Sequence, residues 1–346
     1  MKRYLNTLYV TTQGARLRRD GQNLVIAVEG EEKARFPIHG LGGVVALGRV
    51  SASPAALELC AEHGTTVTYL TETGRFLARV EGPVSGNVLL RREQYRRSAD
   101  EACCAPIVRS LVIGKAVNQR AVVRRALRDH GERMGSAARS ALEEAERRLT
   151  DVARRAQRAA DVDALRGLEG EAGRVYFGVF RYLILVEDEG LGFEGRTRRP
   201  PLDPVNASLS FVYTLLTHDL RSACETVGLD PAVGFLHRDR PGRPSLALDL
   251  AEEFRPWFAD RLVLSLINRR QLCGRDFRKL ENGAVLLSDD ARRSVIVAYQ
   301  ERKREELRHP ILEETTTIGL LPLIQAQLLA RHLRGDLDAY PPFFWK

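Results

Sequence analysis

The sequence predicts an α+β protein: a small N-terminal β domain with an embedded short helix, followed by a larger all-α domain. Three observations support this fold class. Apolar and polar residues alternate between turn signals in the first part of the chain, a Gly/Pro/Ser-rich segment follows at 82–86, and helical patterns fill the remainder. A chain of 346 residues also exceeds one ordinary small core. We expect the β domain at 1–84, a linker at 85–88 and the helical domain at 89–346.

The β domain is predicted from short alternating segments that are separated by turn residues. Its first strand includes Leu8, and Asp20-Gly21 marks a hairpin turn between residues 15–18 and 24–28. One short helix is expected over 55–62, because Ser53 suits a helix cap and Pro54 suits the first helical position. The other strands are expected at 34–38, 65–70 and 75–80, the last two on either side of the turn Thr73-Gly74.

The helical domain begins with an alanine- and arginine-rich stretch from Leu89 to about Arg166. Helices resume near Asn206, which either Asp203 or Asn206 itself could cap. The last two helices are expected at 289–307 and 319–333. The aromatic, proline-broken tail from Tyr340 to Lys346 cannot form a regular helix. It could bind a companion protein or another copy, and we favour packing on the chain's own core.

Charge and composition restrict the class of function. The net charge is +8, and its excess of arginine is consistent with a polyanionic partner. Acidic residues balance many arginines of the 89–166 stretch at helical spacings, which favours solvated helix faces over a dedicated nucleic-acid stripe. No apolar stretch is long enough to span a bilayer, and the N-terminus has no signal-peptide pattern, so we expect a cytoplasmic protein with no membrane partner. Five cysteines without a CxxC pair make a disulfide framework or zinc site improbable.

Four residues in three segments are of the types that hold a divalent metal: Glu169, His237, Asp249 and Glu252. Asp249 and Glu252 are three residues apart, so a helix would place both carboxylates on one side. Carboxylate ligands suit Mg²⁺ or Mn²⁺, and an imidazole shifts the preference towards Mn²⁺. Such an ion could activate an attacking hydroxyl and polarise a phosphoryl oxygen.

Each of these residues also has a simpler explanation. We expect Glu169 to stand at the start of an amphipathic helix, where it could interact favourably with that helix's N-terminus. His237 could be a satisfied, half-buried histidine, and the pair Asp249 and Glu252 could lie on a solvated helix face. The pattern alone leaves these alternatives open.

Four segments resemble the CRISPR adaptation integrase family, the first and universal Cas protein. They are LEGEAGRVYF (168–177), DPVNASLSFVY (203–213), VGFLH (233–237) and LALDLAEEFRP (246–256). Two further segments, NTLYVTTQGARLRRDG (6–21) and EGPVSGNVLLRREQYRR (81–97), resemble the branch found with type I-C systems. The resemblance covers essentially the whole chain, and its motifs occur in the family's order.

The resemblance implies a role for each site residue. It assigns one Mg²⁺ or Mn²⁺ to Glu169, His237 and Glu252, although many members have aspartate where Glu252 stands. Asp249 matches an acid that supports catalysis in the same site. It places Tyr213 beside the bound DNA end and Arg196, which belongs to a Gly-Arg pair, in contact with DNA. Arg198 and Arg199 extend that basic loop, and we infer from the sequence that they also contact DNA.

The resemblance also implies a reaction and an assembly. In that reaction, the 3′-hydroxyl of a short prespacer attacks a phosphodiester at a repeat boundary of the CRISPR array. The helical domain of the protein would be the catalytic domain. The partners implied are double-stranded DNA, a second copy bound through the β domain, and a small ferredoxin-like companion subunit in a heterohexamer. Two alternatives remain open: a metal-dependent branched-DNA nuclease in repair that only hydrolyses, and a non-catalytic DNA-binding scaffold.

Overall fold

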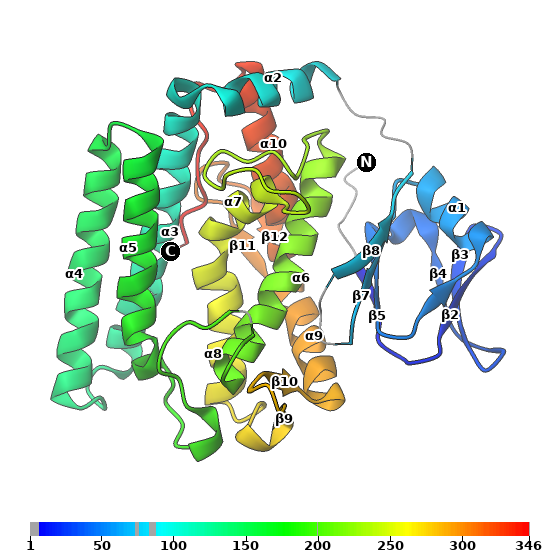
Figure 1. Cartoon of the computed structure of the whole chain (residues 1–346), viewed down its shortest axis with the longest axis horizontal. Helices are drawn as coiled ribbons and strands as arrows, with labels where there is room; N and C mark the ends of the chain where they lie inside the picture. The colour runs from blue at the N-terminus through cyan, green and yellow to red at the C-terminus, as the bar shows by residue number, and fades with distance from the viewer. Residues whose placement is uncertain (1–6, 73–75, 83–87, 199, 346) are drawn as a thin grey trace.

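The structure is a computed structural model that describes residues 7–72, 76–82, 88–198 and 200–345. A small β region, blue in Figure 1, lies beside a larger and mainly helical region. The α+β fold class predicted from the sequence is confirmed. The predicted turn Thr73-Gly74 and most of the predicted linker lie outside the described residues, and the expected domain boundaries stay a prediction.

The β region consists of two four-stranded sheets. The first has the order β1-β5-β7-β8, in which only the β7–β8 pair is antiparallel, and the second has the order β4-β3-β2-β6. The strands of the first sheet are β1 (Thr7–Val10), β5 (Gly43–Leu47), β7 (Thr66–Leu70) and β8 (Phe76–Val80). Those of the second are β2 (Arg16–Asp20), β3 (Asn23–Val28), β4 (Glu31–Pro37) and β6 (Ser51–Ala52).

Local signals explain the two β-region elements that were predicted most sharply. Helix α1 (Pro54–Glu62) begins where Ser53 caps it by accepting a hydrogen bond from the Ala56 N–H. The β2–β3 hairpin turns at Gly21, whose φ of 57° favours glycine. Leu17, Leu24 and Leu59 are buried between these elements, so one apolar core holds the sheets and α1 together.

The helical region begins with α2 (Val88–Ala99), which crosses one end of it (Figure 1). Three long helices then lie side by side and make the layer farthest from the β region: α3 (Glu101–His130), α4 (Ser136–Arg158) and α5 (Val162–Val179). Several exposed arginines of α4 pair with acids of the same layer, for example Arg147 with Glu144 at 2.7 Å. The preference for solvated helix faces over a nucleic-acid stripe stays a prediction.

The remaining helices pack between that layer and the β region. They are α6 (Pro204–Thr226), α7 (Ser245–Phe254), α8 (Arg261–Asn268), α9 (Asp289–Arg304) and α10 (Leu321–Arg334). A π-helical segment, Arg255–Asp260, joins α7 to α8 and contains Pro256. Asp203 caps α6 by accepting from the Asn206 N–H at 2.7 Å, which decides between the two predicted caps. None of the helices described is both long and apolar enough to cross a membrane.

Two short hairpins depart from the all-α expectation for this region. They pair β9 (Phe277–Lys279) with β10 (Val285–Leu287), and β11 (Glu306–Arg308) with β12 (Thr315–Thr317). Each strand has three residues, which is too short for an alternating pattern to stand out from the surrounding helices. All five cysteines are free, as expected.

The two regions meet through buried polar groups. Asp219 of α6 accepts hydrogen bonds from the Tyr299 hydroxyl and the Lys303 ammonium, both at 2.8 Å, and from Thr7 of β1 at 3.3 Å. His218 is buried beside Gly43, and burial lowers the pKa of His218 to about 4. The imidazole is therefore neutral in the folded protein at neutral pH.

We predict that acid weakens the fold through His218. Its pKa is depressed in the folded state, so the unfolded chain binds the extra proton as pH falls from about 6.5 to about 4, and stability is lost over that window. His218→Gln should remove about 2 kcal/mol of the loss between pH 7.5 and pH 5. Urea unfolding of both proteins at the two pH values measures this, with the exposed His39→Gln as control. Equal losses in wild type and His218→Gln would contradict the assignment.

Candidate metal centre

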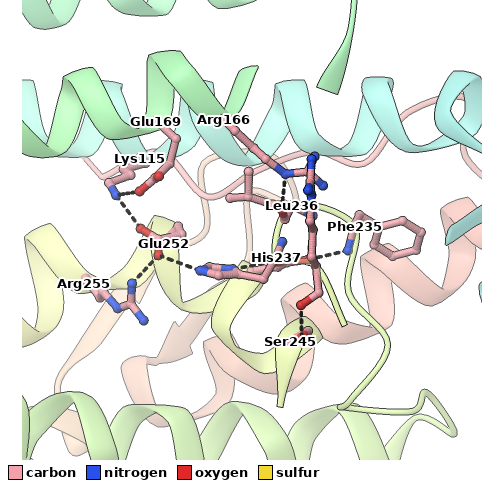
Figure 2. Close-up of polar contacts among 11 residues, drawn as sticks. Lys115, Arg166, Glu169, Phe235, Leu236, His237, Ser245, Glu252 and Arg255 are labelled. Carbon is pink, nitrogen blue, oxygen red and sulfur yellow. Dashed lines mark hydrogen bonds and ion pairs between the residues drawn. The ribbon is translucent and has the colours of Figure 1, made fainter. Parts of the chain in front are cut away.

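Two helices and one loop bring the predicted ligands together. Glu169 lies on α5, Glu252 on α7, and His237 on the loop that precedes α7 (Figure 2). The expectation that Glu169 stands at a helix start is wrong, because α5 begins at Val162, about two turns earlier. Asp161 caps that helix by accepting from the Ala164 N–H at 2.7 Å. An interaction of Glu169 with its own helix N-terminus is therefore not the explanation for this residue.

The two acids of α7 are buried. Asp249 is 0% exposed and Glu252 is 2% exposed, so the alternative of a solvated helix face is wrong. Burial alone would raise the pKa of Glu252, but the Arg255 guanidinium and the Lys115 ammonium hold it well below its usual range. Glu252 is therefore a carboxylate whose charge must be balanced inside the protein.

Asp249 holds the histidine loop in place. Its two oxygens accept hydrogen bonds from the backbone N–H groups of Phe235, Leu236 and His237, at 2.6, 3.0 and 2.9 Å. The loop can approach this closely only because Gly234 has no side chain, since a Cβ there would lie 2.8 Å from Asp249 Oδ2. The sequence prediction placed Asp249 in the site, and the structure shows the contacts by which it orders the loop.

The same carboxylate fixes the orientation of the His237 ring. Nδ1 of His237 lies 2.7 Å from Asp249 Oδ1, which already accepts from a backbone N–H and acts only as an acceptor. Nδ1 therefore donates a hydrogen bond to Asp249, and in the neutral form of the ring the lone pair is on Nε2. Nε2 lies 4.0 Å from Glu252 Oε1. A histidine supported in this way is typical of metal sites.

Sequence reasoning did not select Lys115, which the structure places at the centre of the site (Figure 2). The Lys115 ammonium contacts Glu169 and lies 2.7 Å from Glu252 Oε2. Burial would lower the pKa of Lys115, but Glu252 and Glu169 outweigh it and raise the pKa. A signal was present: Lys115 interrupts the apolar run from Leu111 to Val117, just as Asp249 and Glu252 interrupt theirs.

The donor set fits a hard divalent ion in its chemistry. Two carboxylates and an imidazole lone pair suit Mg²⁺ or Mn²⁺. Glu252 Oε2 is also buried without a hydrogen bond of good geometry, although the Lys115 ammonium is near it. Within the described ranges, however, no three His, Cys, Asp or Glu side chains are arranged to hold an ion, since the lysine stands between Glu169 and Glu252.

Tyr213 is connected to this site through arginines. The guanidinium carbons of Arg196 and Arg255 lie 5.2 and 5.0 Å from the centroid of its ring, and Arg255 pairs with Glu252. The Tyr213 hydroxyl donates to Asp260 at 2.6 Å. Burial raises the pKa of Asp260 to about 7, and the hydrogen bond from Tyr213 opposes that rise.

The predicted DNA-binding arginines have different environments. Arg196 is partly buried and donates to Asn206 at 2.7 Å and Ser210 at 3.1 Å, so it also holds its loop against α6. Arg198 is exposed. Arg199 lies outside the described residues. A polar cavity of about 310 Å³ opens beside His237, lined in part by Asp163, Arg166 and Arg238.

The C-terminal tail packs behind the site. Glu253, next to Glu252, accepts hydrogen bonds from the Tyr340 hydroxyl at 2.5 Å and the Phe343 N–H at 2.7 Å. Asn118 of α3 donates to Glu253 O and Phe343 O and accepts from the Trp345 N–H. The expectation that the aromatic tail packs on the chain's own core is confirmed for residues 340–345.

Curated proteins and a family model match this chain over most of its length. The family described as CRISPR associated protein Cas1 matches residues 8–301. The CRISPR-associated endonuclease Cas1 2 of Rhodospirillum rubrum is 60% identical and covers 100% of both chains. The CRISPR-associated endonuclease Cas1 1 of Chlorobaculum tepidum is 54% identical, again over 100% of both.

Solved structures show the same fold. The Cas1 protein TM1797 of Thermotoga maritima superposes with a TM-score of 0.78 at 24% identity, covering 95% of this chain and 97% of that one. A casposase bound to its integration product gives a TM-score of 0.81 at 22% identity, covering 98% and 94%. These likenesses concern the fold, whereas the family model and the curated relatives identify the family. The chain belongs to the Cas1 family of CRISPR-associated endonucleases, DNA-cleaving and DNA-integrating enzymes of spacer integration.

Proposed function

We propose that this chain joins prespacer DNA to a CRISPR array by transesterification, at a Mg²⁺ or Mn²⁺ site made by Glu169, His237 and Glu252. The attacking group is a prespacer 3′-hydroxyl, and the bond attacked is a phosphodiester at a repeat boundary. One observation carries the proposal: Nε2 of His237, whose ring is oriented by Asp249, faces the buried Glu252 carboxylate at 4.0 Å, where a cation would be stabilised from both sides.

The chain's own residues have separable tasks in this reaction. Asp249 orients the imidazole and holds its loop. Arg255 and Lys115 supply positive charge next to Glu252, which would otherwise repel a phosphodiester. A divalent ion, when bound, would polarise a phosphoryl oxygen and stabilise the charge developing on it. The packed tail and α3 exclude water from the rear of α7.

Positive side chains outside the site would hold the DNA. Arg198 is exposed on the loop before α6. Arg196 of the same loop contacts the ring of Tyr213, and Arg255 contacts that ring as well. We propose that phosphate contacts by this loop, with Arg199 included, position the strand while the ligand set acts on it. Tyr213 would then lie beside the bound DNA end.

We further propose an assembly in which two copies associate through the β domain and a small companion subunit binds between two such dimers. Among the structural neighbours, one chain belongs to a Cas6-RT-Cas1–Cas2 complex, which supports the companion subunit, and another is bound to an integration product, which supports DNA as a partner. The segments 6–21 and 81–97 support membership of a type I-C-like branch.

Strand transfer tests the proposed reaction. Purified protein, with and without the companion subunit, is mixed with Mn²⁺, a labelled duplex with 3′-hydroxyl ends, and a plasmid bearing the repeat array. We expect wild type to join label to plasmid and His237→Ala and Glu252→Gln to lose roughly 100-fold or more, because even supporting residues of metal sites are worth about 10- to 100-fold. Glu171→Gln, on the same helix as Glu169 and paired with Arg155, should keep full activity.

The outcomes separate the alternatives. Cleavage without joining, even with the companion present, would favour the hydrolytic branched-DNA nuclease. Joining that survives both ligand substitutions in folded protein would refute the site assignment. DNA binding with neither product would favour the non-catalytic scaffold.

A second prediction concerns Asp249 as the residue that positions the loop. Asp249→Asn replaces one acceptor oxygen by a donor, so some of the N–H groups at 235–237 lose their partner. We expect faster amide hydrogen exchange at these residues and a free energy of unfolding lower by about 2–4 kcal/mol. Asp163→Asn, an exposed acid paired with Arg238, is the control. Unchanged protection of the loop amides would contradict this role.

A further inference from the structure

The strongest observation outside the predicted ligand set is the position of Lys115. Its ammonium reaches Glu169 on one side and Glu252 on the other, and links α3 to both α5 and α7 (Figure 2). The lysine is 6% exposed and Glu252 is 2% exposed. The Glu169 side chain is 26% exposed. A buried Glu252 carboxylate with a second carboxylate close by would be unfavourable without a nearby cation.

A divalent ion held by Glu169 and Glu252 would take the place of the ammonium at the carboxylate oxygens and would supply two positive charges where Lys115 supplies one. The ammonium and the ion cannot both lie in contact with these oxygens without strong repulsion. Arg255 also pairs with Glu252, at Oε1, the oxygen that lies 4.0 Å from His237 Nε2. Lys115 contacts both Glu169 and Glu252, so it is the side chain that an ion shared by the two carboxylates would have to displace.

We propose that Lys115 is a resident counter-cation that holds Glu169 and Glu252 together in the metal-free protein and withdraws from them when a divalent ion binds. This inference rests on the proposed metal site. It means that the metal-free enzyme is stabilised at the expense of metal affinity. It also explains why the three predicted ligands are close in space but not closed around an ion.

The exchange releases a charged side chain next to the place where the scissile phosphate would lie. An ammonium withdrawn from two carboxylates remains anchored in α3 and surrounded by buried groups, so it needs a new anion. A phosphate oxygen of the bound DNA is the anion that the reaction supplies. Lys115 would then be a positioning residue that contacts the carboxylates before metal binding and the DNA afterwards.

Under this inference, two substitutions of Lys115 change the affinity for Mn²⁺ in opposite directions. Lys115→Met keeps the length of the side chain and removes the charge, so it should bind Mn²⁺ more tightly, roughly ten-fold or more, since about 1.4 kcal/mol of relieved competition already gives ten-fold. Lys115→Arg should bind Mn²⁺ more weakly than wild type, because a guanidinium can engage two carboxylates through a planar fork.

The experiment is calorimetric titration of Mn²⁺ into the full chain without DNA, together with melting temperatures in chelator and in saturating Mn²⁺. Lys115→Met should melt below wild type in chelator and show the larger rise with Mn²⁺. Lys303→Met is the matched control: this buried lysine pairs with Asp219 away from the site, so its loss should lower the melting temperature and leave Mn²⁺ affinity unchanged.

Each outcome is decisive. Weaker or unchanged Mn²⁺ binding by Lys115→Met would overturn the exchange and make Lys115 a structural organiser of the site. If Lys115→Met fails to fold, the Mn²⁺ affinity of Lys115→Arg becomes the test. An affinity of Lys115→Arg for Mn²⁺ that equals or exceeds that of wild type would overturn the inference. Mn²⁺ binding that survives Glu252→Gln would instead refute the metal site itself, so the two failures are distinguishable.

Discussion

The structure depends on how the protein compensates three buried acids on one short helix. Asp249, Glu252 and Glu253 of α7 are at most 2% exposed, and each has its partners in a different part of the chain. Asp249 accepts hydrogen bonds from the loop that contains His237. Glu252 forms ion pairs with basic residues of α3 and of the π-helical segment. Glu253 accepts hydrogen bonds from the C-terminal tail. Because a buried carboxylate without partners is costly, these contacts fix the position of α7 relative to all its neighbours. Precision at the site follows from that constraint.

Much of the fold could be predicted because its signals are local. Ser53 and Pro54 mark the start of α1, and Asp20-Gly21 marks the β2–β3 turn, without reference to the rest of the chain. The start of α5 was placed wrongly because Leu89 to Arg166 was treated as one pattern. Breaks at Asp100 and Asp161, both helix caps in the structure, lay inside that pattern and were not used.

The candidate site could be predicted in part. The three-residue spacing of Asp249 and Glu252 placed both on one helix face. The prediction of Glu169 and His237 as metal ligands depended more on the segments that resemble the family. Lys115 could not be assigned a partner from sequence, since its contacts with Glu169 and Glu252 cross 54 and 137 residues of chain and depend on how three helices pack. Arg255 has a helical spacing to Glu252, which looks like an ordinary surface pair until its burial is known.

The hydrogen bonds that hold the C-terminal tail against α3 and α7 have a consequence for the order in which the protein folds. The hydrogen bonds of Asn118 to Phe343 and Trp345 join residues 225 and 227 apart, and the bond from Phe343 to Glu253 joins residues 90 apart. Contacts of such long range carry a large loop-closure entropy and form after local helices. Helices α3, α4 and α5 can associate early through neighbouring segments, but α7 gains its full set of partners only when the tail docks. Assembly of the candidate site thus depends on a long-range contact of the chain.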